Sequence, residues 1–158
     1  MKPPANEREL MERMAPGALC QAGCLGSDVR GLGEIIEADS AALARQGVDG
    51  GELGRRLEGI LRAAEAGLGR PVQVAEGLTA VHREAMGRIA CPWRGCGVFP
   101  KGQVELDDAR TGRRFLLTPL SVHMILCHGF YQGRGSPYRL EPLELAEALG
   151  LTVTGGGQ

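Results

Sequence analysis

Aromatic side chains are scarce in this chain of 158 residues, which contains 3 Phe, 2 Tyr and 1 Trp. None of them precedes Trp93, so residues 1–90 have to build their core from Leu, Ile, Val, Met and Ala. The amino-terminal residues also lack the apolar core of a signal peptide, and no apolar run approaches the roughly 20 residues of a membrane-spanning helix. We therefore expect a cytoplasmic protein with no membrane partner.

Motifs of common catalytic sites are absent as well. The sequence contains no His-Glu-x-x-His zinc motif, no phosphate-binding loop and no dinucleotide fingerprint. Charge of either sign is never dense: the net charge is −1, and residues 91–142, with 7 Lys and Arg against 4 Asp and Glu, are only mildly basic. This bias is far below the dense positive surface of a dedicated DNA-binding domain.

Glycine, by contrast, is abundant: the chain has 25, roughly twice ordinary usage. Glycine raises the entropy that is lost on folding, so a fold rich in it benefits from an additional tether such as a bound metal. The 5 cysteines are an odd number in a chain that shows no secretory signal. We expect them to be reduced thiols or metal ligands, with Cys20 and Cys24 packed in the structure.

The first half of the chain is predicted to be helical. Apolar residues recur at helical spacing within residues 30–46 and again between Asp49 and Gly67, and the glycine-rich turn between these segments predicts a helical hairpin. Asp49 is the expected N-cap of the second helix, and Glu52 is expected to complete a capping box. Residues 78–89 fit either a helix or a strand, and an extended conformation is preferred.

The second half carries a clearer pattern. Alternation of apolar and polar residues starts at Val104 and resumes after a turn at Phe115, which predicts a β-hairpin. Thr118 is a good N-cap and Pro119 occupies the favoured first helical position, so a helix is expected to run to about His128.

Candidate metal ligands gather around this helix. Cys91 and Cys96 lie on a tight Cys-Pro-Trp-Arg-Gly-Cys turn, and His123, Cys127 and His128 lie on the helix. Two sulfurs from a turn and two ligands from a helix commonly assemble a tetrahedral zinc site. His123 and Cys127 are about 40° apart on the helix and His123 and His128 about 140°, so His128 joins only if the last turn distorts. We predict zinc bound by Cys91, Cys96, His123 and His128, with Cys127 as the substitute ligand.

The order of the elements, together with the spacings Cys-x4-Cys and His-x4-His, resembles a C2H2-type zinc finger over about 40 residues. The resemblance implies a zinc-binding ββα unit. The family usually has about 12 residues between its second cysteine and first histidine, whereas this chain has 26, so the family's base-contacting positions are not carried over. In the alternative without a metal, Cys127 is a buried thiol and His123 a core histidine.

These features together predict an α+β fold in which an N-terminal helical hairpin packs beside a small zinc-nucleated ββα unit. The expected segments are a flexible N-terminal segment (1–16), a helical part (17–70), a β-rich metal-binding part (71–142), a C-terminal helix (143–150) and a tail (151–158).

The segment Gly-Phe-Tyr-Gln-Gly-Arg-Gly-Ser-Pro-Tyr-Arg is the most unusual stretch of the chain. Its glycines allow backbone N–H groups to converge on an anion, and Arg134 and Arg139 offer the forked charge that a phosphate or carboxylate prefers. We predict an anion- or partner-binding site formed by Arg134, Ser136, Arg139 and Tyr131. In the alternative, the loop only wraps the metal unit and Arg139 pairs with Glu141 or with a backbone carbonyl.

The preferred function is a zinc-stabilised cytoplasmic binding or regulatory protein that acts through protein–protein interaction. An unidentified protein is the expected partner, and a homodimer is the alternative. A second hypothesis is nucleic-acid binding through the basic 91–142 segment, with its arginines on phosphates and Tyr131 or Trp93 stacked on bases.

A third hypothesis is a small metal-dependent enzyme. It requires an open zinc position for water, with Glu105, Asp107 or Asp108 as the base. A thiolate nucleophile at Cys127 is a further variant, although adjacent residues on a helix point apart.

Overall fold

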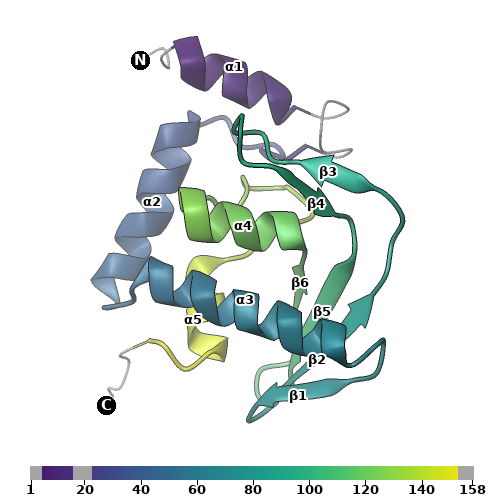
Figure 1. The fold of residues 1–158 in the computed structure, drawn as a ribbon. Coiled ribbons are helices and arrows are strands. Elements are labelled where there is room, and N and C mark those ends of the chain that lie inside the picture. Colours follow the sequence, from purple (N-terminus) through teal and green to yellow (C-terminus); the bar gives the residue numbers. More distant parts are fainter. Residues whose placement is uncertain (1–4, 16–22, 153–158) are drawn as a thin grey trace.

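The computed structural model describes residues 5–15 and 23–152, and Figure 1 shows how the helices and strands are arranged. The elements, in chain order, are α1 (Ala5–Arg13), α2 (Leu32–Arg45), α3 (Gly50–Ala66), β1 (Val72–Ala75), β2 (Leu78–Arg83), β3 (Arg88–Ala90), β4 (Val98–Pro100), β5 (Gln103–Asp108), β6 (Arg113–Leu117), α4 (Pro119–His128) and α5 (Pro142–Ala148). Among the described residues the strands form a four-stranded antiparallel sheet in the order β1-β2-β5-β6 and a two-stranded sheet of β3 and β4. The fold is α+β, as predicted.

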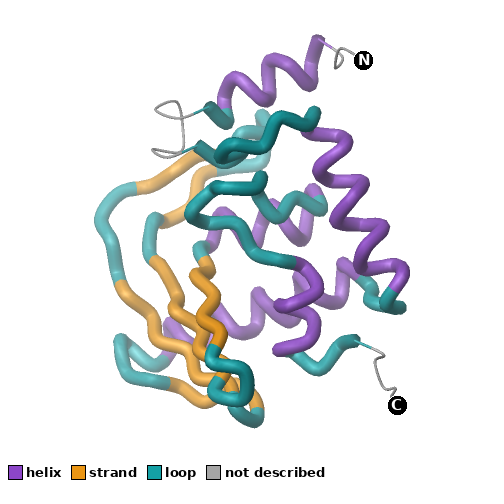
Figure 2. The backbone as a smooth tube through the Cα atoms, turned by 180° about the vertical axis from the view of Figure 1, so that it is seen from behind, coloured by secondary structure: helices purple, strands orange, loops and turns teal. Residues whose placement is uncertain are grey.

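One face of the four-stranded sheet is covered by α3, which contacts β1 and β2 (Figure 1). In Figure 2, which is seen from behind, the strands lie in front of this helix. Alternate residues of the central strands are buried, namely Leu78 and Ala80 of β2 and Val104 and Leu106 of β5. Successive side chains of a strand point to opposite faces, so these four residues share one face of the sheet.

The two sheets are parts of one long antiparallel ribbon. One leg runs through β2 and β3, and the other returns through β4 and β5. The pairing is interrupted between them, where residues 84–87 face residues 101–102. The ambiguous residues 78–89 therefore contain β2 and the start of β3 and no helix, in agreement with the extended conformation preferred from the sequence.

Contacts between helices differ from the prediction. Asp49 caps α3 by accepting a hydrogen bond from the Gly51 N–H at 2.9 Å, but Glu52 does not complete a capping box. The N-terminal helical hairpin is not confirmed, because α3 packs chiefly against α4 and α2 packs against α5. The prediction assumed that helices adjacent in sequence are each other's main partners, whereas the apolar stripe of α3 is buried against α4 and the sheet.

The ββα arrangement is not confirmed either. The strands nearest the two cysteines are β3 and β4, yet β5 and β6 of the larger sheet follow before α4 begins. The hairpin of these two strands and their turn, residues 103–117, occupies 15 of the 26 residues that separate Cys96 from His123. The hairpin predicted from the alternation at Val104 and Phe115 is present as β5 and β6.

Two apolar clusters hold the structure together. The larger lies between the four-stranded sheet and the helices, with Leu57 and Leu106 fully buried within it. The smaller joins α1, α2 and α4 to the tip of the ribbon, and it contains Met14, Ile35 and Phe130. Full burial of one such side chain contributes about 1.5–3 kcal/mol. The N-terminal segment predicted to be flexible thus includes a helix whose following residue, Met14, is fully buried.

Gly54 sets the distance between α3 and α4. A Cβ atom added at Gly54 would lie 2.9 Å from Leu126 Cδ1 and 3.0 Å from Leu126 Cα. The absence of a side chain therefore allows the two helices to pack closely. Gly59, on the same helix, is exposed, and a Cβ atom there would meet nothing within 4 Å.

The two glycines predict opposite effects of one substitution. Gly54→Ala is expected to lower the free energy of unfolding by about 1–3 kcal/mol, because the methyl group forces α4 away. Gly59→Ala is expected to raise it by about 0.5–1 kcal/mol through helix propensity alone. Urea unfolding followed by circular dichroism measures both. Equal effects of the two substitutions would contradict the close helix contact.

Candidate metal centre

The tip of the ribbon presents two sulfur atoms. It is closed by a hydrogen bond in which the Cys91 N–H donates to the Gly97 carbonyl at 3.1 Å. Gly95 and Gly97 have φ values of 83° and 107°, a backbone region that residues other than glycine rarely adopt. These glycines turn the chain tightly enough to bring Cys96 back towards Cys91. Cys91 is buried and Cys96 is half-buried.

Local sequence signals fix both ends of α4. Thr118 caps the first turn by accepting a hydrogen bond from the Ser121 N–H at 3.0 Å. The helix stops at Gly129, which has a φ of 63°, and the Phe130 N–H reaches back to the Met124 carbonyl at 3.1 Å. The distortion expected of the last turn is not present, because α4 stays an α-helix through His128.

Four side chains converge where the ribbon tip meets α4. One ligand atom from each of Cys91, Cys96, His123 and His128 lies within 4.8 Å of the others. The His128 Nε2 atom is 3.8 Å from the Cys91 sulfur and 3.3 Å from the Cys96 sulfur. Ligands of a tetrahedral zinc ion are separated by about 3.3–3.8 Å, given zinc–ligand bonds of about 2.0–2.3 Å. The group is therefore close to the size that a zinc ion requires.

The imidazole of His123 carries an independent sign of a ligand site. Its Nε2 atom is buried and has no hydrogen-bond partner among the described residues. Leaving a buried polar atom unpaired costs about 1–3 kcal/mol. Coordination of a metal ion by this nitrogen would remove that cost, so the residues present fit a zinc ion.

Aromatic rings hold both histidines in place. Trp93, which lies between the two cysteines, stacks on His128 with a centroid distance of 3.9 Å and an interplanar angle of 5°. Phe99 lies against His123 at a centroid distance of 4.5 Å. Neither ring was predicted to have this role. The position of Trp93 inside the Cys-x4-Cys turn is the one local signal that could have indicated it.

Burial sets the protonation of the centre. It lowers the pKa of His123 and, together with the neighbouring His123, the pKa of His128. Both imidazoles are therefore neutral at pH 7 and can donate a lone pair to a metal. Burial also raises the pKa of the Cys91 thiol to about 11. Because zinc binds the thiolate, metal binding has to displace the Cys91 proton.

The N-terminal helix α1 is bound to the ribbon tip. The Arg13 Nε–H donates to the Pro92 carbonyl at 2.7 Å, and Arg94 pairs with Glu9 at 2.7 Å. Residues 13 and 92 are 79 positions apart, and no periodicity in the sequence indicates that they meet. The tip is thus packed between α1 and α4 (Figure 1).

Cys127, the substitute ligand, is an exposed free thiol and is not part of the converging group. The remaining cysteines are Cys20 and Cys24. Cys20 lies outside the described residues. Cys24 is fully buried and disulfide-bonded. The expectation of a reduced thiol is therefore wrong for Cys24.

The acidic residues considered as a base point elsewhere. Glu105 pairs with Arg83, Asp107 with Arg114 and Asp108 with Arg110. None of the three belongs to the converging metal-ligand group of the described residues.

The predicted anion site around Arg139 is not assembled. The guanidinium group is 10 % exposed and has five N–H groups. They donate to both Asp39 oxygens, both Glu141 oxygens and the Gln132 carbonyl, over 2.8–3.1 Å. No N–H group remains for an external anion. The pairing of Arg139 with Glu141 and a backbone carbonyl is the alternative that the sequence left open.

The other residues of that site are also engaged. Tyr131 and Ser136 are buried, and burial raises the pKa of Tyr131. Arg134 has an exposed side chain, while its carbonyl accepts from the Ser27 N–H at 2.8 Å. The glycines serve this close backbone contact: a Cβ atom added at Gly133 would collide with the Leu25 carbonyl. The loop is therefore packed against the segment around Leu25 rather than arranged around an anion.

Comparison of the chain with protein-family models, with curated proteins and with solved structures finds no match in any of the three. Within the described residues, every helix is too short or too polar to cross a membrane.

Arg139 and Arg134 form a matched pair for stability. Arg139→Ala is expected to lower the free energy of unfolding by about 3–5 kcal/mol, because it leaves the buried Asp39 carboxylate without its partner. Arg134→Ala keeps the hydrogen bonds that the backbone of residue 134 makes with Asp28 and Ser27, and it is expected to change stability by less than about 0.5 kcal/mol. Urea unfolding of the two variants is the measurement, and similar losses would contradict the internal role of Arg139.

Zinc binding is expected to release about one to two protons per ion at pH 7, from the thiols and not from the neutral histidines. Calorimetric titration in two buffers of different ionisation enthalpy gives this number. Affinity is expected to fall as the pH is lowered from 7 to 5, because protons compete with zinc for the Cys91 sulfur. A proton release near zero would contradict thiolate ligation.

Proposed function

We propose that this chain is a zinc-stabilised, non-catalytic protein that acts by binding another protein. The observation that carries the zinc assignment is the convergence of two thiols and two neutral imidazoles. One of these imidazoles has a buried nitrogen without a hydrogen-bond partner in the described part of the chain. These donors match the borderline-soft preference of zinc.

A structural role for the metal is favoured by the number of ligands. Four protein ligands complete a tetrahedral shell, so no coordination position remains for water or substrate. In small zinc-dependent peptides such a site contributes about 10–16 kcal/mol of binding free energy to folding. Here the metal would join the two-stranded sheet to α4, and a two-stranded hairpin alone is marginally stable.

Interaction with a protein is favoured over nucleic-acid binding by the state of Arg113, Arg114 and Arg139. Arg113 pairs with Glu144 and Glu147, and Arg114 pairs with Asp107. Arg139 has no free N–H group. Phosphate binding would have to displace these carboxylates. Of the aromatic residues proposed to stack on bases, Tyr131 is buried and Trp93 already stacks on His128.

The zinc assignment is tested by elemental analysis of protein purified without chelators. One zinc per chain is expected in the wild type. Cys96→Ser and His123→Ala are each expected to lower the zinc content well below one, whereas Cys127→Ser should retain it fully. Cys127→Ser is the matched control, because it removes a thiol from the same region without removing a ligand. Folded wild-type protein without stoichiometric metal would contradict the proposal.

The closed shell is tested with cobalt in place of zinc. The absorption spectrum of the cobalt protein is expected to show a tetrahedral ion bound by two sulfurs and two nitrogens. Addition of azide or cyanide should leave the spectrum unchanged, because no solvent ligand is available for exchange. A spectral change would indicate an open position and would favour the metal-dependent enzyme instead.

A further inference from the structure

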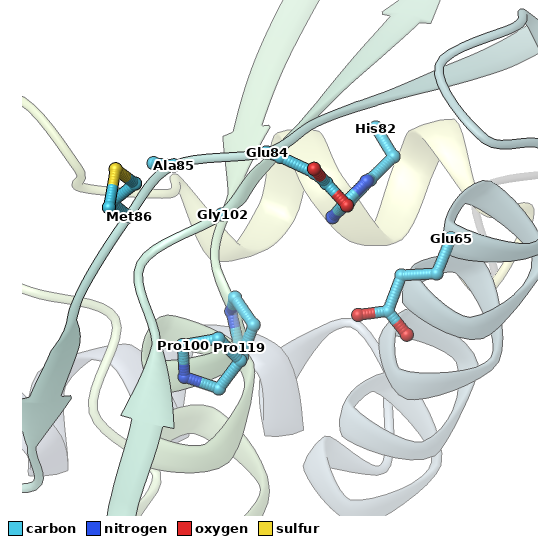
Figure 3. Close-up of a pocket in the computed structure, with 8 residues that line it drawn as sticks. All are labelled: Glu65, His82, Glu84, Ala85, Met86, Pro100, Gly102 and Pro119. Atoms are coloured by element: carbon cyan, nitrogen blue, oxygen red, sulfur yellow. The ribbon is translucent and has the colours of Figure 1, made fainter.

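A cavity of about 480 Å³ lies where the four-stranded sheet meets the two-stranded sheet. Figure 3 shows its walls, which come from α3, from both legs of the ribbon and from the start of α4. Its polar lining is provided by Glu65, His82 and Glu84, and its apolar lining includes Met86, Pro100 and Pro119. It shares no residue with the metal centre.

The interruption of the ribbon forms this cavity. Residues 84–87 have only residues 101–102 opposite them, so one leg bulges outward. Bulges of this kind re-aim side chains and are frequent beside binding sites. Gly102 contributes the space: a Cβ atom added there would lie 3.1 Å from the His82 Nε2 atom. His82 lies on the same face of β2 as Leu78 and Ala80. The helix that covers this face, α3, ends at Ala66.

The polar side chains of the cavity have no partners among the described residues. The side chains of Glu65, His82 and Glu84 form no hydrogen bond or ion pair with any other residue in the ranges 5–15 and 23–152. Arg83, the nearest arginine in sequence, is paired with Glu105. Two carboxylates beside apolar walls therefore face one cavity without a neutralising cation. This charge pattern complements a cationic group that has an aliphatic stem.

The cavity fits a side chain better than a metal ion. Its volume is in the range of sites for organic ligands. Within the described part of the chain, the cysteine and histidine group is the one set of three or more metal-binding atoms that lie close together. Glu65 and Glu84 come from different elements and approach the cavity from different sides (Figure 3).

The adjoining backbone is available as well. Glu84, Ala85 and Met86 are exposed, and Met86 is 95 % exposed. The backbone hydrogen bonds of the described turns and loops include none made by these three residues, whereas the next residue, Gly87, accepts from the Lys101 N–H at 3.2 Å. An extended peptide can pair with such a free backbone edge, while an adjacent pocket selects one of its side chains.

We propose that the cavity receives the arginine or lysine side chain of an extended segment of the partner protein. The cationic group lies between Glu65 and Glu84 beside His82, and its aliphatic stem packs on Pro100 and Pro119. The backbone of the segment pairs with residues 84–86, and Met86 covers the inserted side chain. This proposal rests on the proposed function, and it names the chemistry of the partner.

The test uses zinc-loaded, isotopically labelled full-length protein and capped Ala-Arg-Ala and Ala-Lys-Ala peptides. At low salt, both peptides are expected to shift the amide signals of residues 82–87 and 101–102. A capped Ala-citrulline-Ala peptide, which has nearly the same shape without the charge, is expected to bind at least about tenfold more weakly. Higher salt should weaken the cationic peptides but not the neutral one.

Matched variants make the test specific. The double variant Glu65→Gln with Glu84→Gln is expected to lose at least about tenfold in affinity for the arginine peptide. The double variant Glu52→Gln with Glu76→Gln removes the same charge from exposed positions outside the cavity and is expected to bind as the wild type does. Both variants should keep full zinc content, because neither changes a ligand.

The proposal would be overturned by equal binding of the arginine and citrulline peptides, by unchanged affinity of the Glu65 and Glu84 variant, or by amide shifts confined to another surface. Manganese ions that broaden residues 82–87 and displace the peptide would assign the cavity to a metal ion instead. If zinc is stoichiometric but these peptides do not bind, the partner assignment is wrong and the zinc site is unaffected. Absence of zinc would remove the proposed function independently.

Discussion

The contact between the ribbon tip and α4 is the constraint on which the rest of the smaller apolar cluster depends. The β3–β4 sheet pairs only three residues of each strand, a size at which a hairpin alone is marginally stable. Its tip is held by the stack of Trp93 on His128, by the convergence of two thiols with two imidazoles, and by the Arg13 bond to Pro92. A metal ion at this position would strengthen a contact that the protein already makes through packing.

The parts of the centre that could be predicted from sequence are those encoded locally. The N-cap at Thr118 and the glycine stop at Gly129 define α4, and the turn that carries the two cysteines is marked by Gly95 and Gly97. The choice between Cys127 and His128 could not be predicted from the helix alone. Angular spacing favoured Cys127, but the long imidazole of His128 reaches the sulfurs while stacked on Trp93, which lies 35 positions earlier in the chain.

The predictions of a helical hairpin and of an anion-binding loop were not confirmed, for a different reason. The expected pairing of α2 with α3 overlooked Gly54, which admits α4 as the closer partner of α3. The expected anion loop overlooked Asp39, which is 100 positions from Arg139 in the chain. An arginine among glycines has the same local sequence whether its partner is an external phosphate or a buried aspartate. That distinction is made by tertiary structure alone, because the five N–H groups are satisfied by residues from separate elements.

The proposed metal site and the proposed peptide site lie at opposite ends of the β3–β4 sheet. Zinc at the tip would fix β3 and β4, and the other ends of these strands lead directly to Met86 and Pro100 in the cavity wall. The cavity's other walls belong to α3 and β2, which the larger apolar cluster holds without a metal. A bound peptide would thus rest against one wall fixed by packing and another fixed by coordination. Any binding that favours the ordered ribbon must by linkage also favour zinc, since both ligands select the same conformation.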